Sequence, residues 1–154
     1  MSEQQAPVFG IEKIYVKDAS LEIPNAPQVF LEREAPAIEV QLRSEGSNIT
    51  EDVFHVLLTV TVTAKIGEKT LFLVEVGQAG IFRIQNIPEQ EMEPVLSIAC
   101  PNILFPYARE TISDLVTRAG FPPVLLAPVN FEAIYQQRQM AQKQTQPSGD
   151  IPIQ

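Results

Sequence analysis

Apolar and polar residues alternate along most of the first half of the chain, and this alternation predicts β-strands. The clearest case is the stretch 53–64, where the even positions from Phe54 to Val62 are apolar and the odd positions hold a histidine and three threonines. Similar patterns predict strands at 8–23, 38–43, 70–78 and 81–84. Because the connections between them are short, we expect an antiparallel sheet with one face towards solvent.

Three stretches interrupt these strands. Ser44 to Asp52 is polar and predicts a turn, and Gly77 and Gly80 predict a second turn before the short strand 81–84. Residues 28–37 predict a loop, although Val29, Phe30 and Leu31 within it are apolar. Apolar side chains in a loop must either be covered by the rest of the protein or stay available to a ligand.

A long helix is predicted by apolar residues spaced four, four, three and four apart: Leu104, Ala108, Ile112, Leu115 and Ala119. Pro106 fits the first turn of such a helix, and Gly120 followed by Pro122 fits its end. Three more large side chains lie largely off this stripe, namely Ile103, Phe105 and Tyr107. A helix that is apolar on two sides is expected to pack against its own sheet and against another copy of the chain.

The rest of the second half predicts shorter elements. Residues 89–99 read as a first helical piece, residues 120–129 as an apolar, proline-rich crossover, and Asn130 as the cap of a last helix. We expect a flexible arm at 1–7, a single domain at 8–140 and a disordered polar tail at 141–154. The predicted fold is therefore α+β, with a four-stranded antiparallel sheet and two main helices packed on one of its faces.

The charge of the chain restricts its partners. The 154 residues carry a formal net charge of −8, and residues 1–52 hold ten Asp and Glu against four Lys and Arg. This charge argues against binding nucleic acid or an anionic membrane surface, and it permits a basic partner. The single cysteine, Cys100, cannot form an internal disulfide, and we expect neither a secretory signal nor a membrane span. These features favour a soluble protein of the cytoplasm.

A search for catalytic chemistry returns only weak candidates. His55, the sole histidine, and Cys100 could be proposed as a base and a nucleophile, but nothing in their spacing supports the pair. The glycines at 77 and 80 do not form a phosphate-binding loop, and the acidic pair Glu51 and Asp52 lacks further metal ligands. The residues favour a binding protein over an enzyme, without a metal or cofactor.

One unusual stretch resembles a known family. The eleven residues Cys-Pro-Asn-Ile-Leu-Phe-Pro-Tyr-Ala-Arg-Glu at 100–110 are similar to a segment of the bacterial export chaperone family SecB. So are Lys13 to Asp18, Pro24-Asn-Ala-Pro27, Gly80-Ile-Phe82, and the segments 118–122 and 126–131. The resemblance covers roughly residues 10–135.

The resemblance implies a function and a set of partners. It implies an ATP-independent chaperone that binds unfolded preproteins, keeps them competent for translocation and delivers them to the motor SecA. It also implies a homotetramer, built as a dimer of dimers, whose long helix pairs the dimers. The SecA segment that docks in this family is short, basic and zinc-bearing.

Candidate site residues follow from the matching motifs. The resemblance places a SecA-binding surface at Asp18, Glu22, Leu73 and Glu75, which the strand alternation also puts on the polar face of the sheet. A groove for unfolded peptide is expected at Val29, Phe30, Val40, Leu42, Phe121, Leu125 and Leu126. The oligomer interface is expected on the long helix at Leu104, Tyr107, Ile112 and Leu115.

The sequence departs from the family at two places, and two other functions stay open. Glu34 stands where many members carry tryptophan, and the tail is rich in glutamine instead of acidic. The alternatives are a non-catalytic adaptor that binds one folded partner, and an enzyme or small-molecule-binding domain. An enzyme should have a deep pocket with converging polar groups, whereas a chaperone should bind many unfolded chains.

Overall fold

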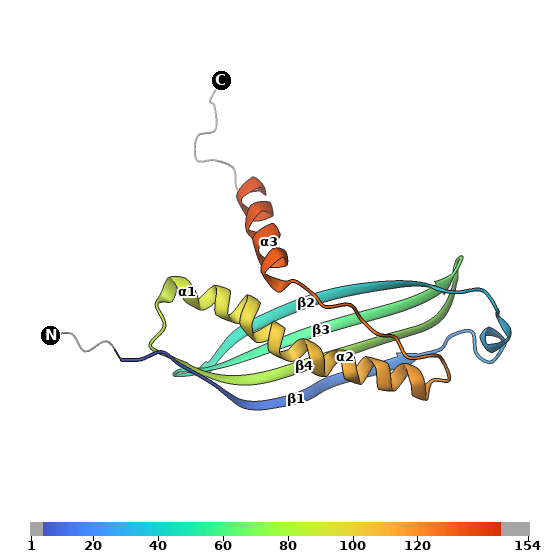
Figure 1. The fold of residues 1–154 in the computed structure, drawn as a ribbon, viewed down its shortest axis with the longest axis horizontal. Coiled ribbons are helices and arrows are strands. Elements are labelled where there is room, and N and C mark those ends of the chain that lie inside the picture. Colours follow the sequence, from blue (N-terminus) through green and yellow to red (C-terminus); the bar gives the residue numbers. More distant parts are fainter. Residues whose placement is uncertain (1–4, 146–154) are drawn as a thin grey trace, which may run out of the picture.

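A computed structural model describes residues 5–145 of the chain. Four long strands form one antiparallel sheet in the order β1-β4-β3-β2: β1 (Val8–Glu22), β2 (Ala37–Thr50), β3 (Val53–Ile66) and β4 (Lys69–Gln85). A 3₁₀ turn, η1 (Gln28–Leu31), lies between β1 and β2. The helical second half comprises α1 (Glu89–Pro94), a π-helical segment η2 (Val95–Ala99), α2 (Cys100–Arg118) and α3 (Phe131–Thr145). Figure 1 shows α1 and α2 as one long rod across a single face of the sheet.

The α+β architecture with a four-stranded antiparallel sheet is confirmed, and both main helices lie on the same side of it. α2 packs along β4 and β3, whereas α3 contacts η2 and projects away from the sheet beyond its first turns (Figure 1). Phe131 in the first turn of α3 is buried and meets the ring of Phe105 edge-on at 5.9 Å. Within residues 5–145, none of the helices is long and apolar enough to cross a membrane.

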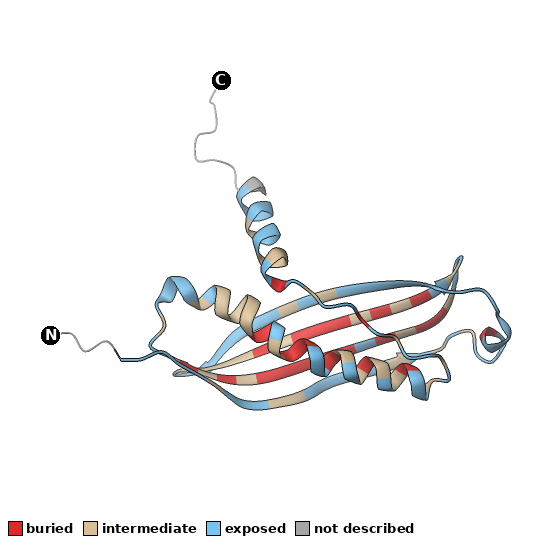
Figure 2. Cartoon of the chain, in the orientation of Figure 1, coloured by how far each residue is buried: buried red, intermediate tan, exposed pale blue. Residues whose placement is uncertain are grey.

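The core lies between α2 and the two central strands. The even residues from Val56 to Val62 of β3 are fully buried, as are Val74, Val76 and Phe82 of β4. From α2, Leu104, Ala108 and Ile112 close this layer with no exposed surface. In Figure 2 the buried positions follow β3, β4 and one side of α2, while β1 and β2 at the two edges are largely exposed. The core is thus the layer predicted by the alternation in 53–64.

The two expected turns in the strands were wrong. β2 continues through Thr50, and only Glu51 and Asp52 turn, with Asp52 at a φ of 63°. Asn48 stabilises this tight turn by donating to the carbonyl oxygens of Thr50 and Val53. The polar residues of 44–50 resemble a loop in the sequence because β2 is an edge strand, and an edge strand can expose polar side chains.

β4 likewise runs unbroken past Gly77 and Gly80, which serve packing instead of a turn. A Cβ on Gly80 would come within 2.7 Å of the Phe82 ring and 3.0 Å of Leu104, so glycine allows α2 to approach the sheet closely. The turn expected there was therefore wrong, and the strands at 70–78 and 81–84 are one strand.

The long helix begins earlier than the sequence pattern indicated. Helical backbone is continuous from Glu89 to Arg118, so Pro106 lies inside α2 and not in its first turn. A π-helical segment, η2, lies within this continuous stretch and directly precedes Cys100 and Pro101. At the other end, Gly120 has a φ of 96° and stops the helix as predicted.

The last helix is capped as predicted, because the side chain of Asn130 accepts a hydrogen bond from the backbone N–H of Ala133 at 3.0 Å. α3 extends to Thr145, so the first residues of the expected tail 141–154 are helical. The remainder of that tail, and residues 1–4 of the expected arm, lie outside the described residues.

Candidate functional sites

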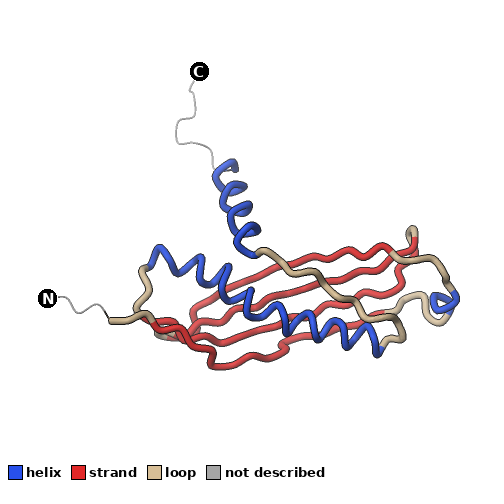
Figure 3. The backbone as a smooth tube through the Cα atoms, in the orientation of Figure 1, coloured by secondary structure: helices blue, strands red, loops and turns tan. Residues whose placement is uncertain are grey.

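The crossover from α2 to α3 forms one wall of an apolar groove. After Gly120 the chain runs back as an extended loop over the helix-covered side of the sheet until α3 begins (Figure 3). The groove has a volume of about 740 Å³ and is open to solvent along one side. Its walls come from η1, the start of β2, the bulged start of β4 and the crossover: Val29, Phe30, Glu32, Glu34, Pro36, Ile38, Val40, Leu71, Phe72 and residues 120–127.

Three aromatic rings hold this groove together. Phe121 stacks on Phe30 with ring centroids 5.1 Å apart, and it also contacts Phe72 at 5.0 Å. Gly120 permits the close approach, since a Cβ there would lie 3.1 Å from the Phe30 ring. Phe72 is buried, whereas Phe30 leaves 47% of its surface exposed, so the trio connects the core to a solvent-accessible wall.

Much of the groove wall is apolar and uncovered. Leu125 is 82% exposed, and Ile38 and Val40 on β2 are each more than 40% exposed. Exposed apolar side chains gathered along one groove are typical of a site for an apolar partner. An extended segment of another polypeptide would cover them without needing a deep, enclosed pocket.

Six of the seven residues predicted for the groove line it, and Leu42 does not. Leu42 lies instead in a small cleft under α3, with Phe131, Ile134 and Tyr135. Val29 lines the groove but is 2% exposed, so it belongs mainly to the core. The prediction missed Leu71 and Phe72. Alternation already puts Phe72 on the helix-covered face, whereas Leu71 is the extra residue of a bulge opposite Ala64 and Lys65, which alternation alone does not reveal.

The second candidate site lies on the opposite, uncovered face of the sheet. In the pairing of β1 with β4, Glu22 lies opposite Leu73, Ser20 opposite Glu75, and Asp18 opposite Gly77. Residues directly opposite in an antiparallel pair point to the same face. Asp18, Glu22 and Glu75 are exposed and Leu73 is half-buried, so three carboxylates share this face with one apolar side chain, and Glu22 and Glu75 are the two next to it. We call these four residues the acidic patch.

Neighbouring strands fix the geometry of the acidic patch. Thr61 on β3 donates a hydrogen bond to the Glu75 carboxylate at 2.7 Å, which orients that side chain. Gly77 leaves space beside Asp18, since a Cβ on Gly77 would contact the Cβ of Asp18 at 3.7 Å. Across the sheet, Thr63 pairs with both Leu73 and Glu39. Glu39 therefore lies on the same face as the acidic patch, a neighbour that the sequence analysis did not include.

The helix residues predicted for an oligomer interface divide into two groups. Leu104 and Ile112 have no exposed surface, because they pack against the sheet of their own chain. Tyr107 is 50% exposed and Leu115 is half-buried, so these two can contact another copy. On the same side of the sheet, β1 leaves Phe9, Ile11 and Val16 exposed.

Cys100 and His55 lie on opposite sides of the sheet. Cys100 is fully buried beside the helix-covered face, and burial raises the pKa of its thiol to about 12. His55 lies on the outer face, where its Nε2 atom is 2.7 Å from the Tyr15 hydroxyl. A nucleophilic cysteine needs a lowered pKa and a nearby base, and this arrangement gives the reverse. Within residues 5–145, no group of His, Cys, Asp and Glu is arranged to hold a metal ion.

Comparisons with known proteins agree with these features. The sequence matches the family described as Preprotein translocase subunit SecB over residues 2–143. It is 61% identical to "Protein-export protein SecB" of Dechloromonas aromatica over 154 residues, covering 100% of both chains. It is 65% identical to the protein of the same name from Thiobacillus denitrificans over 144 residues, covering 94% of this chain and 95% of the relative.

A solved structure shares the fold at low sequence identity. The chain superposes on the SecB-like chaperone of Mycobacterium tuberculosis, solved in complex with a ChAD peptide from an antitoxin, with a TM-score of 0.66. The two are 16% identical, and the match covers 79% of this chain and 90% of the other. At this identity the likeness supports the arrangement of sheet and helices.

Proposed function

Because the chain belongs to the SecB family, we propose that it is an ATP-independent chaperone of protein export that works in the cytoplasm. It binds preproteins before they fold, keeps them competent for translocation and passes them to the motor SecA. The observation that carries this proposal is the open apolar groove beside the crossover, about 740 Å³ in volume. Unfolded chains expose the apolar side chains that such a groove can cover.

The groove suits extended and variable segments. Its exposed walls are Leu125 of the crossover, Phe30 of η1, and Ile38 and Val40 of β2. β2 is also an edge strand, with unpaired backbone groups along its outer side. An extended client could therefore combine apolar contacts with backbone hydrogen bonds, and neither kind of contact demands one particular sequence.

A refolding assay tests the holding of clients. A denatured preprotein diluted into buffer should refold more slowly when the chaperone is present in stoichiometric amounts, and ATP should not change the delay. Refolding at the free rate at every ratio would reject the chaperone proposal. Tight binding of one folded protein, with no effect on unfolded chains, would favour the adaptor instead.

We propose the acidic patch as the docking site for SecA. Carboxylates speed encounter with a basic segment, while Leu73, beside Glu22 and Glu75, supplies apolar area that a partner can bury. The basic, zinc-bearing C-terminal segment of SecA has the complementary charge. Calorimetric titration of SecA into the chaperone should show binding that weakens as salt is added.

We also propose that the chain forms a tetramer, as a dimer of dimers. The exposed apolar side chains Phe9, Ile11 and Val16 on β1, with Tyr107 on α2, leave more apolar surface than one chain covers. β1 is an edge strand, so pairing of two copies there would also satisfy its free backbone groups. Light scattering at micromolar concentration should give the mass of four chains, and a monomer that persists on concentration would reject this assembly.

A further inference from the structure

The groove wall that carries Phe30 is not part of the sheet. Phe30 lies in η1, and Val29 is the one residue of η1 that is buried. Two backbone hydrogen bonds fold the segment on itself: the N–H of Val29 donates to the carbonyl oxygen of Asn25 at 2.9 Å, and the N–H of Glu32 donates to the carbonyl oxygen of Val29 at 3.2 Å. The segment 25–32 is therefore a compact unit, and its place beside the sheet depends on what holds its two ends.

Both ends of this unit are held by side-chain contacts to the start of β4. At the first end, the Nδ2 atom of Asn25 donates a hydrogen bond to the backbone carbonyl oxygen of Thr70 at 2.9 Å. At the other end, the ammonium group of Lys69 donates to the Glu32 carboxylate, also at 2.9 Å. Lys69 and Thr70 are consecutive residues, so one short stretch of the β3–β4 hairpin anchors η1 at both of its ends.

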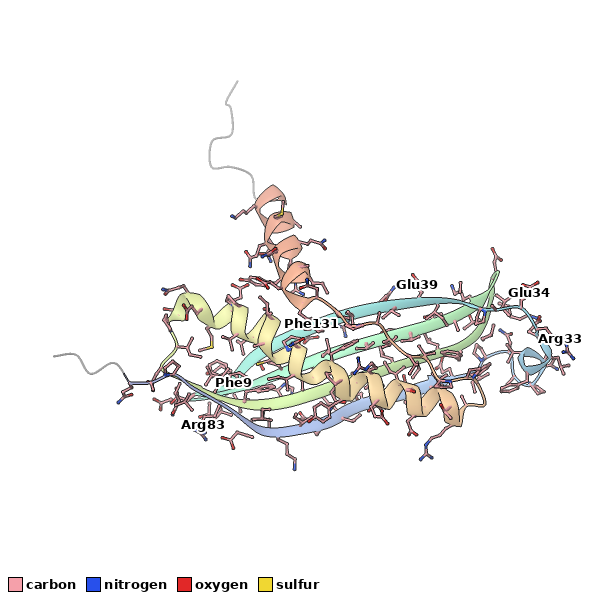
Figure 4. The ribbon with its side chains drawn as sticks, viewed as in Figure 1. Phe9, Arg33, Glu34, Glu39, Arg83 and Phe131 are labelled. Atoms are coloured by element: carbon pink, nitrogen blue, oxygen red, sulfur yellow. The ribbon has the colours of Figure 1, made fainter. Side chains whose placement is uncertain are left out.

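This anchoring connects two walls of the groove. Leu71 and Phe72 directly follow the anchoring stretch of β4, and they line the groove together with η1. Figure 4 shows Arg33 and Glu34, which follow η1, at the end of the molecule where Figure 1 shows the turn from β3 to β4. Lys69 itself does not line the groove, so it acts on a client only through the place of η1.

We propose that Asn25 and Lys69 are positioning residues of the client groove. They hold η1 against the start of β4, and they thereby fix where the Phe30 ring stands in the groove. The inference rests on the proposed chaperone function, and it adds two residues that act on clients without touching them, since neither lines the groove. It also gives a role to the asparagine of the motif Pro24-Asn-Ala-Pro27, which the groove walls do not include.

Charge removal at Lys69 tests the ion pair. The client is an uncharged, apolar, fluorescent peptide, so direct charge contacts with the groove play no part. In anisotropy titrations of the full-length protein at low salt, Lys69→Met should bind this peptide about threefold more weakly than wild type, the size typical of an exposed ion pair. Added salt should bring the two affinities together, because it screens the pair in the wild type.

Lys65→Met is the matched control for Lys69→Met. Lys65 is an exposed lysine on β3, the other strand of the same hairpin, and it forms none of the ion pairs found within residues 5–145. The control makes the same change in net charge and should keep the affinity of the wild type. An equal loss in both variants would mean that net charge, and not the contact with Glu32, affects the client.

Reversal of the ion pair separates its contact from the charge of either partner. Glu32→Lys alone should weaken binding, because it places two cations side by side. Glu32→Lys combined with Lys69→Glu restores the attraction and should recover the affinity of the wild type. Asn25→Ala removes the contact at the other end of η1, and the loss of one hydrogen bond there should weaken binding about fivefold.

A fluorine label reports the place of η1 without any client. A para-fluorophenylalanine at position 30 senses the ring current of Phe121, because the two ring centroids are 5.1 Å apart. Its NMR resonance should shift in Lys69→Met and in Asn25→Ala, and it should return in the reversed pair. Lys65→Met should leave the resonance in place, and so would a loss of stability in a protein that stays folded.

The outcomes separate this inference from the proposed function. Unchanged affinity with an unmoved resonance in Lys69→Met or in Asn25→Ala would overturn the assignment of that residue, and a reversed pair that binds weakly would overturn the role of the ion pair. A shifted resonance with unchanged affinity would also overturn the inference, since clients would then not depend on where η1 lies. If the wild-type protein does not bind the peptide, the proposed function fails, and the resonance alone decides whether the two residues position η1.

Discussion

The acidic patch and the groove lie on opposite faces of one sheet and are built in different ways. The acidic patch sits on regular strands, where backbone pairing such as Glu22 with Leu73 sets the distance between side chains. The groove is assembled from η1, a strand edge, a bulge and a crossover loop, and side-chain contacts around Phe121 hold these pieces together. One site has its geometry fixed by hydrogen bonds and the other by packing.

This difference fits the partners that we propose for the two sites. A single docking partner gains from a rigid surface with charges at fixed positions. Many different unfolded segments gain from walls that can adjust, and loops with few backbone hydrogen bonds adjust most easily. We therefore expect the two sites to respond to separate substitutions, unless the layer between them is disturbed.

The largest effect should come from that shared layer. Leu104 is fully buried between α2 and the sheet, so Leu104→Ala should lower the free energy of unfolding by about 3–5 kcal/mol and weaken both sites together. Urea unfolding followed by circular dichroism measures the change. Glu110→Ala, at an exposed position of the same helix, should stay within about 0.5 kcal/mol of wild type. Equal stability of both variants would contradict the core placement of Leu104.

Charge reversal in the acidic patch should weaken binding at that site and leave the groove unaffected. Asp18→Lys or Glu75→Lys should weaken SecA binding at least about tenfold, because the substitution replaces an attractive contact with a repulsive one. Client holding and assembly should stay unchanged, since both side chains are exposed on the outer face. Calorimetry with SecA and the refolding assay measure the two properties. Glu51→Lys, in the β2–β3 turn, is the control of equal charge, and SecA affinity unaffected by either reversal would move the docking site elsewhere.

Removing an aromatic ring from the groove should have the opposite effect: client binding should weaken while SecA binding is unchanged. Phe30→Ala removes the half-exposed ring that stacks on Phe121, and we expect client affinity to fall about tenfold. SecA binding should be retained. Leu31→Ala is the matched control, since Leu31 is 81% exposed and does not line the groove. Peptide anisotropy reports the effect, and an equal loss in the two variants would mean that general apolarity, not the groove, holds the client.

The smallest effect should be the pH dependence of the free energy of unfolding that comes from Cys100, which is buried in the layer between the two sites. Burial raises the pKa of Cys100 from 9.0 to about 12, so the folded state keeps the proton at pH values where the unfolded chain loses it. The thiol therefore contributes stability that is fully present below pH 9 and declines as the pH rises above it. Between pH 7.5 and 9.5 this one group should lower the free energy of unfolding by about 0.8 kcal/mol.

Cys100→Ala isolates that contribution, because the two proteins differ only at this residue. The variant should lose stability less steeply than wild type over the same pH range, whatever its stability at neutral pH. Parallel curves for the two proteins would show that Cys100 is not held protonated by burial.

The regular parts of the fold could be predicted from the sequence, because the pattern that specifies them lies in neighbouring residues. Alternation in 53–64 assigns the faces of β3 correctly, and the same reasoning brings Asp18, Glu22 and Glu75 to one face once β1 and β4 are adjacent. The pairing of those two strands joins residues far apart in the chain, so no local pattern reveals it. There the resemblance to SecB supplied what periodicity could not.

Other features depend on tertiary contacts that a pattern does not contain. Gly77 and Gly80 are turn residues by composition, yet Gly80 is needed because Phe82 and Leu104 crowd its position. Leu42 lies on the same face of β2 as the groove residue Val40, but it lines the cleft under α3 instead of the groove. The spacing of apolar residues predicts helix over Val95–Ala99 but does not reveal that this segment is π-helical.

The strand order β1-β4-β3-β2 also has a consequence for how the chain folds as it is synthesised. β2, β3 and β4 follow one another through short turns, so they can form a meander as soon as they leave the ribosome. β1 leaves first but must wait for β4, its partner across the sheet, and the closing of that long loop is entropically costly. During this interval the nascent chaperone exposes an unpaired strand edge of its own, and it is for a short time the kind of polypeptide that the finished protein binds.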